Sequence, residues 1–406
     1  MTGGTLQLNG FGKQDVYLTG KPSINHFRYV YRQYVNFAIE QIRQTPVGEV
    51  NFGRKFSVYI SRSADLLSNV SFVFKLPALS IAAGSTYTGW TNNLASTIVK
   101  QVELEIGNQV INRLYSVWLD IWDELTTDES HRDANNLRLG KFDDITATQT
   151  NATADNYYSI TIPFYFNKHP ELALPLLALK YSDVKVNIEL REFQECVTYD
   201  GATAPTAVNM TYGIVYGEYV YLDPRILPEY LNAPGFIYLI RQVNLNNNAP
   251  QVIAATGTSV RNIKQQLAFN NPVSELVWVL VESLSLTNND WFNYSKRSDT
   301  TNQITEAGIL ADGQDLVSFR TEDYFRLTLP IQYHTHGQSK HIYINSFALH
   351  PEDLNPSGSI NFSRYDSVEL QLRIKESNLE TNLYVFAINY NLLVVKNGMA
   401  GLSWNA

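Results

Sequence analysis

One motif occurs twice in this chain, and it constrains the possible folds more than any other feature. His-Pro-Glu stands at 169–171 and again at 350–352, each time with a phenylalanine three residues before the histidine and a proline six residues after it. Each copy then runs into an alternation of apolar and polar residues, at 184–190 and 368–374. Because such alternation is typical of a half-buried strand, the chain repeats a turn together with the strand that follows it.

Two further pairs of segments support an internal duplication. The stretch "NVSFVFKL" near 70 resembles "ELVWVLVESL" near 276, and "EIGNQVI" near 106 resembles "LADGQDLV" near 312, both at an offset of about 206 residues. The His-Pro-Glu pair has an offset of about 181, so the first copy is predicted to hold roughly 25 additional residues. Two copies of one unit fit a chain of 406 residues, since domains commonly contain about 200 residues or fewer.

Strand signals dominate both halves of the chain. The predicted strands are 56–61, 70–76, 100–107, 182–190, 214–222, 236–245, 275–284, 325–333, 341–349, 366–374 and 383–395. Only "NRLYSVWLDIWDEL" (112–125) has a convincing helical pattern. Many short strands between turn residues predict β-sandwiches or barrels, and the proline-rich segment 223–235 is interpreted as the linker between two of them.

The composition is that of a folded protein, with 44% hydrophobic and 17% charged residues. No apolar run approaches the roughly 18 residues of a membrane span, and the first ten residues lack a secretory pattern, so synthesis in the cytosol is expected. The net charge of −8 is uneven, because residues 1–62 carry +5 and the remainder therefore −13. A basic end on an acidic body is one arrangement that meets phosphates of nucleic acid or lipid, and scattered solvated charges are the alternative.

Motifs that would identify an enzyme are absent from the sequence. It contains no G-x-S-x-G, no G-x-x-x-x-G-K-[ST] and no H-E-x-x-H, and Gly10–Gly12 lacks the third glycine of a dinucleotide site. The single cysteine, Cys196, excludes an intrachain disulfide and is interpreted as an inert buried side chain. The carboxylate pairs Asp143–Asp144 and Glu322–Asp323 fall in polar segments with nothing that predicts an acid–base pair. No enzymatic activity and no cofactor are predicted.

The remaining candidate sites concern histidines and asparagines. His334, His336 and His341 are the weak candidates for a metal site, with an exposed hairpin loop as the alternative. His169 and His350 resemble a matched catalytic pair, but a turn before a strand is the favoured interpretation. Five sequons, whose glycosylation stays open, occur at Asn69, Asn151, Asn209, Asn293 and Asn361.

The N-terminal stretch "GGTLQLNGFGKQDVYLTGKPSINHFRYVYRQYVNFAIEQI" (3–42) closely resembles the start of the major capsid proteins of nucleocytoplasmic large DNA viruses. The resemblance continues through the rest of the chain, in "VELEIGNQVI" (102–111), "LALPLLALKYSDVKV" (172–186), "NPSGSINFSRYDSVEL" (355–370) and "NYNLLVVKNGMAGLSW" (389–404). It implies an all-β double jelly roll: two tandem eight-stranded antiparallel sandwiches with short helices in the loops. The expected parts are an inward-facing segment (1–23), a first jelly roll (24–222), the linker (223–235) and a second jelly roll (236–406).

The same resemblance implies a function in virion architecture. Three chains are expected to form a pseudo-hexagonal homotrimer, and such trimers to tile an icosahedral shell assembled in the host cytoplasm. The expected partners are neighbouring trimers, minor capsid and penton proteins and, through residues 1–23, the internal viral membrane, without sequence-specific nucleic acid binding. The polar segments 128–156 and 288–312 are predicted to form the outer surface.

Two other classes of function stay open on the sequence alone. A jelly-roll lectin or attachment protein would bind glycans through aromatic loops such as "STYTGWTNN" (85–93) and "NNDWFNY" (288–294). A cupin-type enzyme would need a cluster of metal-binding His and Glu residues. A lectin alone would not require the N-terminal motif or the duplication.

Overall fold

The computed structural model describes two compact units, residues 1–37 and residues 38–406. It describes residues 3–10, 12–13, 15–21, 34–81, 84–142, 148–149, 152–232, 235–255, 257, 260–297, 300–337, 340–375 and 377–404. The N-terminal unit contains two short helices, α1 (Gly3–Asn9) and α2 (Asp15–Thr19). In the described part of the chain, no helix has the length and apolar character that a membrane span requires.

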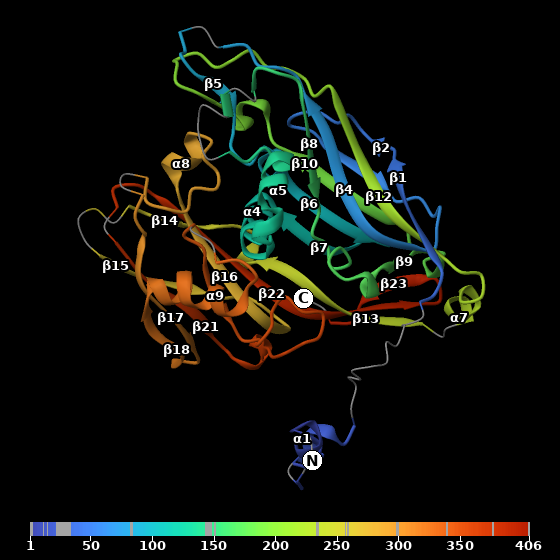
Figure 1. The fold of residues 1–406 in the computed structure, drawn as a ribbon. Helices are drawn as coiled ribbons and strands as arrows, with labels where there is room; N and C mark the ends of the chain where they lie inside the picture. Colours follow the sequence, from blue (N-terminus) through green and yellow to red (C-terminus); the bar gives the residue numbers. More distant parts are fainter. Residues whose placement is uncertain are drawn as a thin grey trace. The chain divides into compact units, whose positions relative to one another are not determined.

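The first sandwich consists of two antiparallel sheets, drawn in blue to yellow-green in Figure 1. Sheet 1 has the order β1 (Phe37–Gln44), β12 (Tyr212–Leu222), β4 (Leu66–Leu76) and β8 (Asn156–Thr161), with β9 (Leu174–Pro175) also paired to β4. Sheet 2 has the order β2 (Pro46–Val47), β3 (Lys55–Tyr59), β10 (Val184–Leu190), β6 (Val99–Ile106) and β7 (Gln109–Tyr115). A two-stranded ribbon joins β5 (Thr88–Trp90) to β11 (Val197–Tyr199).

The second sandwich is drawn in yellow to red and is built in the same way (Figure 1). Sheet 3 has the order β13 (Phe236–Leu245), β22 (Thr381–Lys396), β16 (Pro272–Glu282) and β19 (Tyr343–Ser346); β14 (Gln251–Ile253) and β23 (Met399–Leu402) pair with β22, and β20 (Ile360–Asn361) with β16. Sheet 4 has the order β15 (Arg261–Gln266), β21 (Val368–Ile374), β17 (Ile304–Ala311) and β18 (Gln314–Thr321).

The strand orders of the two sandwiches match over four strands in each pair of sheets. Sheet 1 (β1-β12-β4-β8) corresponds to sheet 3 (β13-β22-β16-β19), and β3-β10-β6-β7 of sheet 2 corresponds to sheet 4 (β15-β21-β17-β18). The offset of about 206 residues read from the sequence relates β4 to β16 along their whole length, since Leu66–Leu76 corresponds to Pro272–Glu282. The duplication predicted from the sequence is therefore confirmed as two sandwiches of one topology.

Each sandwich is closed by side chains that alternate along its strands. In β4, Val70, Phe72 and Phe74 are buried in the hydrophobic core, and the intervening residues point to the other face of sheet 1. The rings of Phe72 and Phe74 stack at a centroid distance of 5.2 Å. In the second sandwich, the fully buried Trp278 packs against Phe325 at 5.3 Å. Aromatic pairs of this kind contribute about 0.5–1.5 kcal/mol beyond the area that they bury.

Short helices occupy the connections between strands. They are α3 (Leu94–Ile98), α4 (Ser116–Thr126), η1 (Glu129–His131), α5 (Arg132–Leu139), η2 (Pro170–Leu172), η3 (Leu176–Ala178), η4 (Phe193–Cys196), α7 (Leu227–Asn232), η5 (Asn246–Asn248), α8 (Ser283–Thr287), η6 (Tyr324–Thr328), α9 (Leu329–Tyr333) and η7 (Phe362–Arg364). The predicted helix 112–125 begins later than expected, because its first residues complete strand β7. The predicted linker 223–235 contains α7.

The strand predicted at 325–333 is wrong, because this segment forms the π-helical turn η6 followed by α9. Its apolar residues are spaced by two, which suggests a strand, but the same residues also fall at spacings of four. In the helical form Phe325 and Leu329 are buried on one side, while Leu327 and Ile331 are exposed on the other. Pro330 favours the helix, since proline cannot donate to a strand ladder but is accepted in the first turn of a helix.

Candidate functional site

The two sandwiches meet along a seam that is built from the edge of sheet 2 and one face of sheet 3. Strand β7 lies beside β13, and helix α4, which follows β7 directly, packs on β22 (Figure 1). Trp118 of α4 contacts Phe386 of β22 at a ring-centroid distance of 5.2 Å, and both side chains are buried. The side-chain amide of Gln242 donates to the main-chain carbonyl of Ile111. Because side chains such as Trp118 and Phe386 are buried in the seam, a charge that is buried beside them needs a partner.

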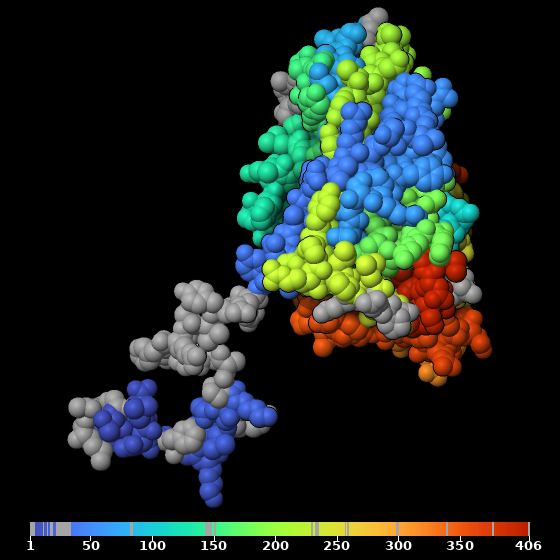
Figure 2. All heavy atoms as spheres, turned by 90° about the vertical axis from the view of Figure 1, so that its right-hand side faces the viewer, coloured from blue at the N-terminus to red at the C-terminus, as the bar shows by residue number. Residues whose placement is uncertain are grey.

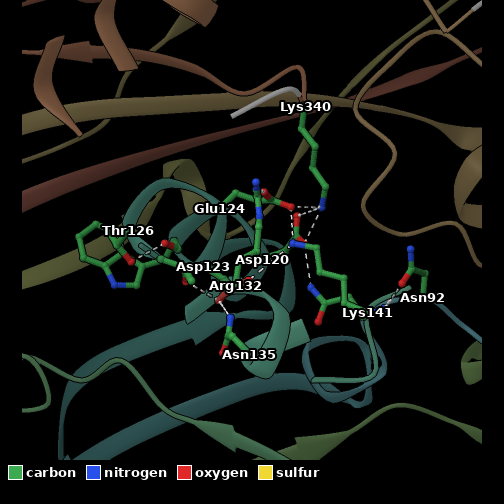
Figure 3. Close-up of polar contacts among 12 residues, drawn as sticks. Asn92, Asp120, Asp123, Glu124, Thr126, Arg132, Asn135, Lys141 and Lys340 are labelled. Atoms are coloured by element: carbon green, nitrogen blue, oxygen red, sulfur yellow. Dashed lines mark hydrogen bonds and ion pairs between the residues drawn. The ribbon is translucent and has the colours of Figure 1, made fainter. Parts of the chain in front are cut away.

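One charged cluster joins α4 to the second sandwich (Figure 3). Lys340 Nζ donates to both carboxylate oxygens of Asp120, at 2.7 and 2.9 Å. The Asp120 carboxylate is fully buried and also accepts hydrogen bonds from Tyr294 OH at 2.8 Å and Asn93 Nδ2 at 2.8 Å. Asp120 therefore has donors from both sandwiches, since Asn93 belongs to the first and Lys340 and Tyr294 to the second.

The same lysine also reaches Glu124, one turn further along α4. The distance from Lys340 Nζ to Glu124 Oε1 is 3.0 Å, Arg132 Nη2 lies 3.2 Å from Glu124 Oε2, and Lys141 forms a further ion pair with the same carboxylate. Burial alone would raise the pKa of Glu124, but the ammonium groups of Lys340 and Lys141 outweigh it and lower the pKa to about 2. The carboxylate is therefore ionised at neutral pH.

The two copies of the repeated His-Pro-Glu motif meet at the seam. Both form turns, in which the Leu172 amide donates to the His169 carbonyl and the Asp353 amide to the His350 carbonyl. Arg241 of β13 bridges them: its guanidinium donates to the main-chain carbonyls of Pro351 and Glu352 and lies 3.3 Å from His169 Nε2. The sequence prediction of turns at both motifs agrees with this arrangement.

His334, which follows α9, is held between two carboxylates. Its Nε2 lies 2.7 Å from Glu275 Oε1 and its Nδ1 lies 3.0 Å from Glu352 Oε1, and the side chains of His334 and Glu275 are fully buried. Burial alone would lower the pKa of His334, but the two carboxylates raise it to about 9. Glu352 also accepts from Lys168 Nζ at 2.8 Å, which links the second His-Pro-Glu turn to the residue that precedes the first.

The loop 288–294 of the second sandwich packs on the first. Trp291 Nε1 donates to the Glu195 carbonyl at 2.9 Å, and the Asn289 side chain donates to the Gln194 carbonyl at 2.6 Å. The guanidinium of Arg191 lies 3.6 Å from the centre of the Trp291 ring and is buried. A cation that faces an aromatic ring away from water gains on the order of 2 kcal/mol.

The structure places the three histidines proposed as weak metal candidates with different partners. His334 is held by two carboxylates, His336 Nδ1 lies 3.6 Å from Glu129, and the pKa of His341 is lowered to about 4 by burial and by the nearby cations Arg326 and Lys375. Among the residues that the structure describes, no group of three or more His, Cys, Asp or Glu side chains is arranged to hold a metal ion.

The other candidates from the sequence lie in unrelated places. Cys196 is fully buried, and burial raises its thiol pKa, as expected for an inert side chain. Glu322 and Asp323 both pair with Arg326.

The asparagines of the sequons take part in local hydrogen bonds. Asn69 accepts a hydrogen bond from Asn167, Asn209 from Asn51, Asn293 from Ser295, and Asn361 from the Ser363 amide at the start of η7. Asn151 and the pair Asp143–Asp144 lie outside the described residues.

The aromatic loops that suggested a lectin are turned inward. Trp90 and Tyr294 are each about 2% exposed, and Tyr87 OH is hydrogen bonded to Thr198 Oγ1 at 2.8 Å. Within the segment 288–312, Asn289 and Trp291 contact the first sandwich and Ile304–Ala311 form strand β17; its place on the outer surface stays a prediction. These rings therefore offer little surface on which a sugar could stack.

Two family models cover almost the whole chain. "Major capsid protein N-terminus" matches residues 25–223, and "Large eukaryotic DNA virus major capsid protein" matches residues 235–401. The major capsid protein of Pyramimonas orientalis virus is 33% identical and that of Paramecium bursaria Chlorella virus 1 is 31% identical, each over 100% of both chains.

Solved structures give the same result for the fold. The VP54 protein of PBCV-1 superposes with a TM-score of 0.81 at 28% identity, over 94% of this chain and 100% of that chain. The Faustovirus major capsid protein superposes with a TM-score of 0.72 over 97% and 96%, at 13% identity. The second likeness concerns the fold alone.

The paired sandwiches of one topology, joined by a seam of buried ion pairs, define a double jelly-roll capsid protein, so the predicted fold class is confirmed. The chain belongs to the major capsid protein family of large eukaryotic DNA viruses. It is thus a component of the virion capsid, and the lectin alternative is not favoured.

Proposed function

We propose that three copies of this chain close into a pseudo-hexagonal trimer and that such trimers tile an icosahedral shell. The observation that carries this proposal is the matching strand order of the two sandwiches within one chain. Three chains contribute six similar units, and a ring of six similar units approximates a hexagon. The proposed jelly-roll boundaries are 24–222 and 236–406, joined by 223–235.

The proposed role is structural and not enzymatic. It is supported by the structural contacts of polar side chains: Lys340 and Arg241 reach from the second sandwich to Asp120 and His169 of the first. His334 is held between two carboxylates of the second sandwich. Assembly would take place in the host cytoplasm, with minor capsid and penton proteins as additional partners. The segment 1–23 would face inward, toward those proteins or the internal membrane, without sequence-specific contacts to nucleic acid.

The oligomeric state tests the proposal directly. Size-exclusion chromatography with light scattering is expected to give about 138 kDa for three copies of the 46.0 kDa chain. A stable monomer of about 46 kDa at micromolar concentration would count against the proposed tile. Interfaces of obligate trimers commonly bury more than about 2,000 Å², so dilution into the nanomolar range should leave the trimer intact.

A further inference from the structure

In each sandwich one sheet has a face that points away from the core, and among the described residues this face is covered in the second sandwich but not in the first. In the second sandwich, the face of sheet 3 that points away from its own core is covered by α4 and β7 of the first sandwich. Val277 of β16 and Phe386 of β22 lie opposite each other on this face, and both are fully buried. The cover therefore comes from the neighbouring repeat, and not from the sandwich to which sheet 3 belongs.

In the part of the chain that the structure describes, the corresponding face of sheet 1, termed its open face below, carries exposed side chains. Ser71 of β4 lies opposite Tyr216 of β12, at the position that Val277 and Phe386 occupy in sheet 3. On the same face, Ile39 of β1 is 56% exposed and Tyr157 of β8 is 63% exposed. Figure 2 views the body from this side, where β1 in blue and β12 in yellow-green lie at the surface. Exposed apolar and aromatic side chains on both edge strands make this face a candidate surface for a partner.

The second sandwich has a helix that corresponds to α4. Helix α4 follows β7 directly, and the η6–α9 segment follows β18, the counterpart of β7, in the same manner. Phe325 and Leu329 attach this segment to the second sandwich, while Leu327 is 39% exposed and Ile331 is 70% exposed. The segment therefore presents an apolar side that no described residue covers fully.

We propose that the exposed side of η6–α9 of one copy packs on the open face of sheet 1 of a second copy, and so repeats between chains the contact that α4 makes with sheet 3 within one chain. This inference rests on the proposed trimer and assigns its interface. Each copy offers one helix and one face, so the contact is heterologous, and a ring of copies leaves neither surface open.

Two double variants test the two sides of this contact. The face variant carries Ile39→Asp with Tyr157→Asp, and the helix variant carries Leu327→Asp with Ile331→Asp. Both are expected to elute as monomers of about 46 kDa with an unchanged circular dichroism spectrum. The matched control is Leu137→Asp, on α5 and 68% exposed, which lies on neither surface and should remain trimeric. Face and helix variants that both remain trimeric would overturn the assignment and leave the trimer itself intact.

Mixing the two variants tests whether the surfaces are complementary. The face variant retains an intact helix and the helix variant an intact face, so one contact can form and the ring cannot close. A 1:1 mixture is expected to give a mixed dimer of about 92 kDa. A mixture that stays monomeric would contradict a heterologous contact between these two surfaces.

A cross-linking experiment avoids any dependence on destabilised variants. Ile39→Cys with Ile331→Cys in one chain, treated with a short bismaleimide, should give covalent dimers and trimers, because the native Cys196 is buried and protected. Trimers that form without any cross-link would overturn the proposed pairing. If the wild-type chain is itself a monomer, the proposed trimer fails as well, so failure of the interface and failure of the trimer can be told apart.

Discussion

At the scale of single residues, the seam shows how a protein keeps charges inside an apolar contact. Removing an ion from water costs several kcal/mol, and only close partners offset that cost. Asp120 and Glu124 share Lys340, and His334 is shared by Glu275 and Glu352, so each buried charge has at least one partner of opposite sign. Lys340 belongs to the second sandwich and Asp120 to the first, so this pair makes the relative position of the two sandwiches specific. The cluster around His334 lies within the second sandwich and stabilises that sandwich alone.

Lys340→Met is expected to be strongly destabilising, because the fully buried Asp120 would lose its cation. The free energy of unfolding should fall by about 3–5 kcal/mol, measured by urea denaturation. The control is Lys100→Met, which removes the 2.7 Å pair with Glu189 at a half-exposed position and should change stability by at most about 1 kcal/mol. Equal effects of the two substitutions would contradict a special role for Lys340.

The raised pKa of His334 predicts a loss of stability at alkaline pH. Burial opposes the charge and the two carboxylates favour it, which gives a pKa of about 9 in the folded state against about 6.5 in an unfolded chain. The stabilising contribution, on the order of 3 kcal/mol, is thus complete below pH 6.5 and disappears as the pH rises through 9. Urea unfolding between pH 6 and pH 10 should show this slope, and His334→Gln should remove it.

His341 provides a control, because its pKa is lowered in the folded state whereas that of His334 is raised. Its pKa of about 4 lies below the value of an unfolded chain, so the unfolded state binds a proton first as the pH falls from 6.5 to 4. His341→Asn should therefore reduce the loss of stability in this acidic window and leave the alkaline slope unchanged. An effect of His341→Asn above pH 7 would show that the two histidines do not act independently.

The sequence allowed only some of the residues in the seam to be predicted. Asp120 interrupts the apolar side of the segment "VWLDIWDEL", and Arg241 interrupts the apolar strand "FIYLIRQVNL", so each signals a buried charge that needs a partner. The identity of the partners could not be predicted, because Lys340 lies 220 residues from Asp120 along the chain. The histidines at 169 and 350 were correctly interpreted as parts of turns, yet nothing in the sequence placed the two turns beside Arg241.

At the scale of elements, the sequence predicted strands far better than helices. Strands such as 236–245 are confirmed at both ends, because alternation of buried and exposed residues specifies a strand wherever one face is buried. The segment 325–333 misled the prediction because its apolar residues at spacings of two are also residues at spacings of four. Pro330 and the comparison with α4, its counterpart in the first sandwich, make the helical form expected.

Helix α4 is predicted to contribute more to stability through its buried ring than through its partly exposed one. Trp118 is 1% exposed and lies against Phe386, whereas Trp122 is only partly buried. Trp118→Ala should lower the free energy of unfolding by about 3–5 kcal/mol, since it leaves a cavity between the two sandwiches. Trp122→Ala is the matched control, and the same denaturation measurement should give a clearly smaller loss.

At the scale of the whole molecule, the internal duplication explains both the double-sandwich fold and the proposed assembly of the chain. A single sandwich would leave the outer face of sheet 3 exposed, and the chain covers this face with the helix of its own first sandwich. The first sandwich has the same face and the second has the same helix, so the chain satisfies one such contact and leaves one of each surface for another copy. In the proposed trimer, assembly would repeat between chains a contact that folding has already made once.

Removal of residues 1–23 tests whether trimer formation and shell formation depend on different parts of the chain. The contacts of the seam all lie within residues 38–406, and residues 1–37 form a compact unit of their own. The truncated chain is therefore expected to keep the mass of about 138 kDa but to fail in forming closed shells, which electron microscopy of assembly reactions would show.

A second variant separates the charge of this segment from its length. Lys13→Gln with Lys21→Gln removes two of the exposed cations of the basic N-terminal region and keeps every residue in place. If the segment acts through attraction to acidic partners or anionic lipid, this variant should impair shell formation in the same direction as the truncation, and more strongly at high salt, where the remaining attraction is screened. A truncated chain that elutes as a monomer would instead show that residues 1–23 belong to the trimer contact itself.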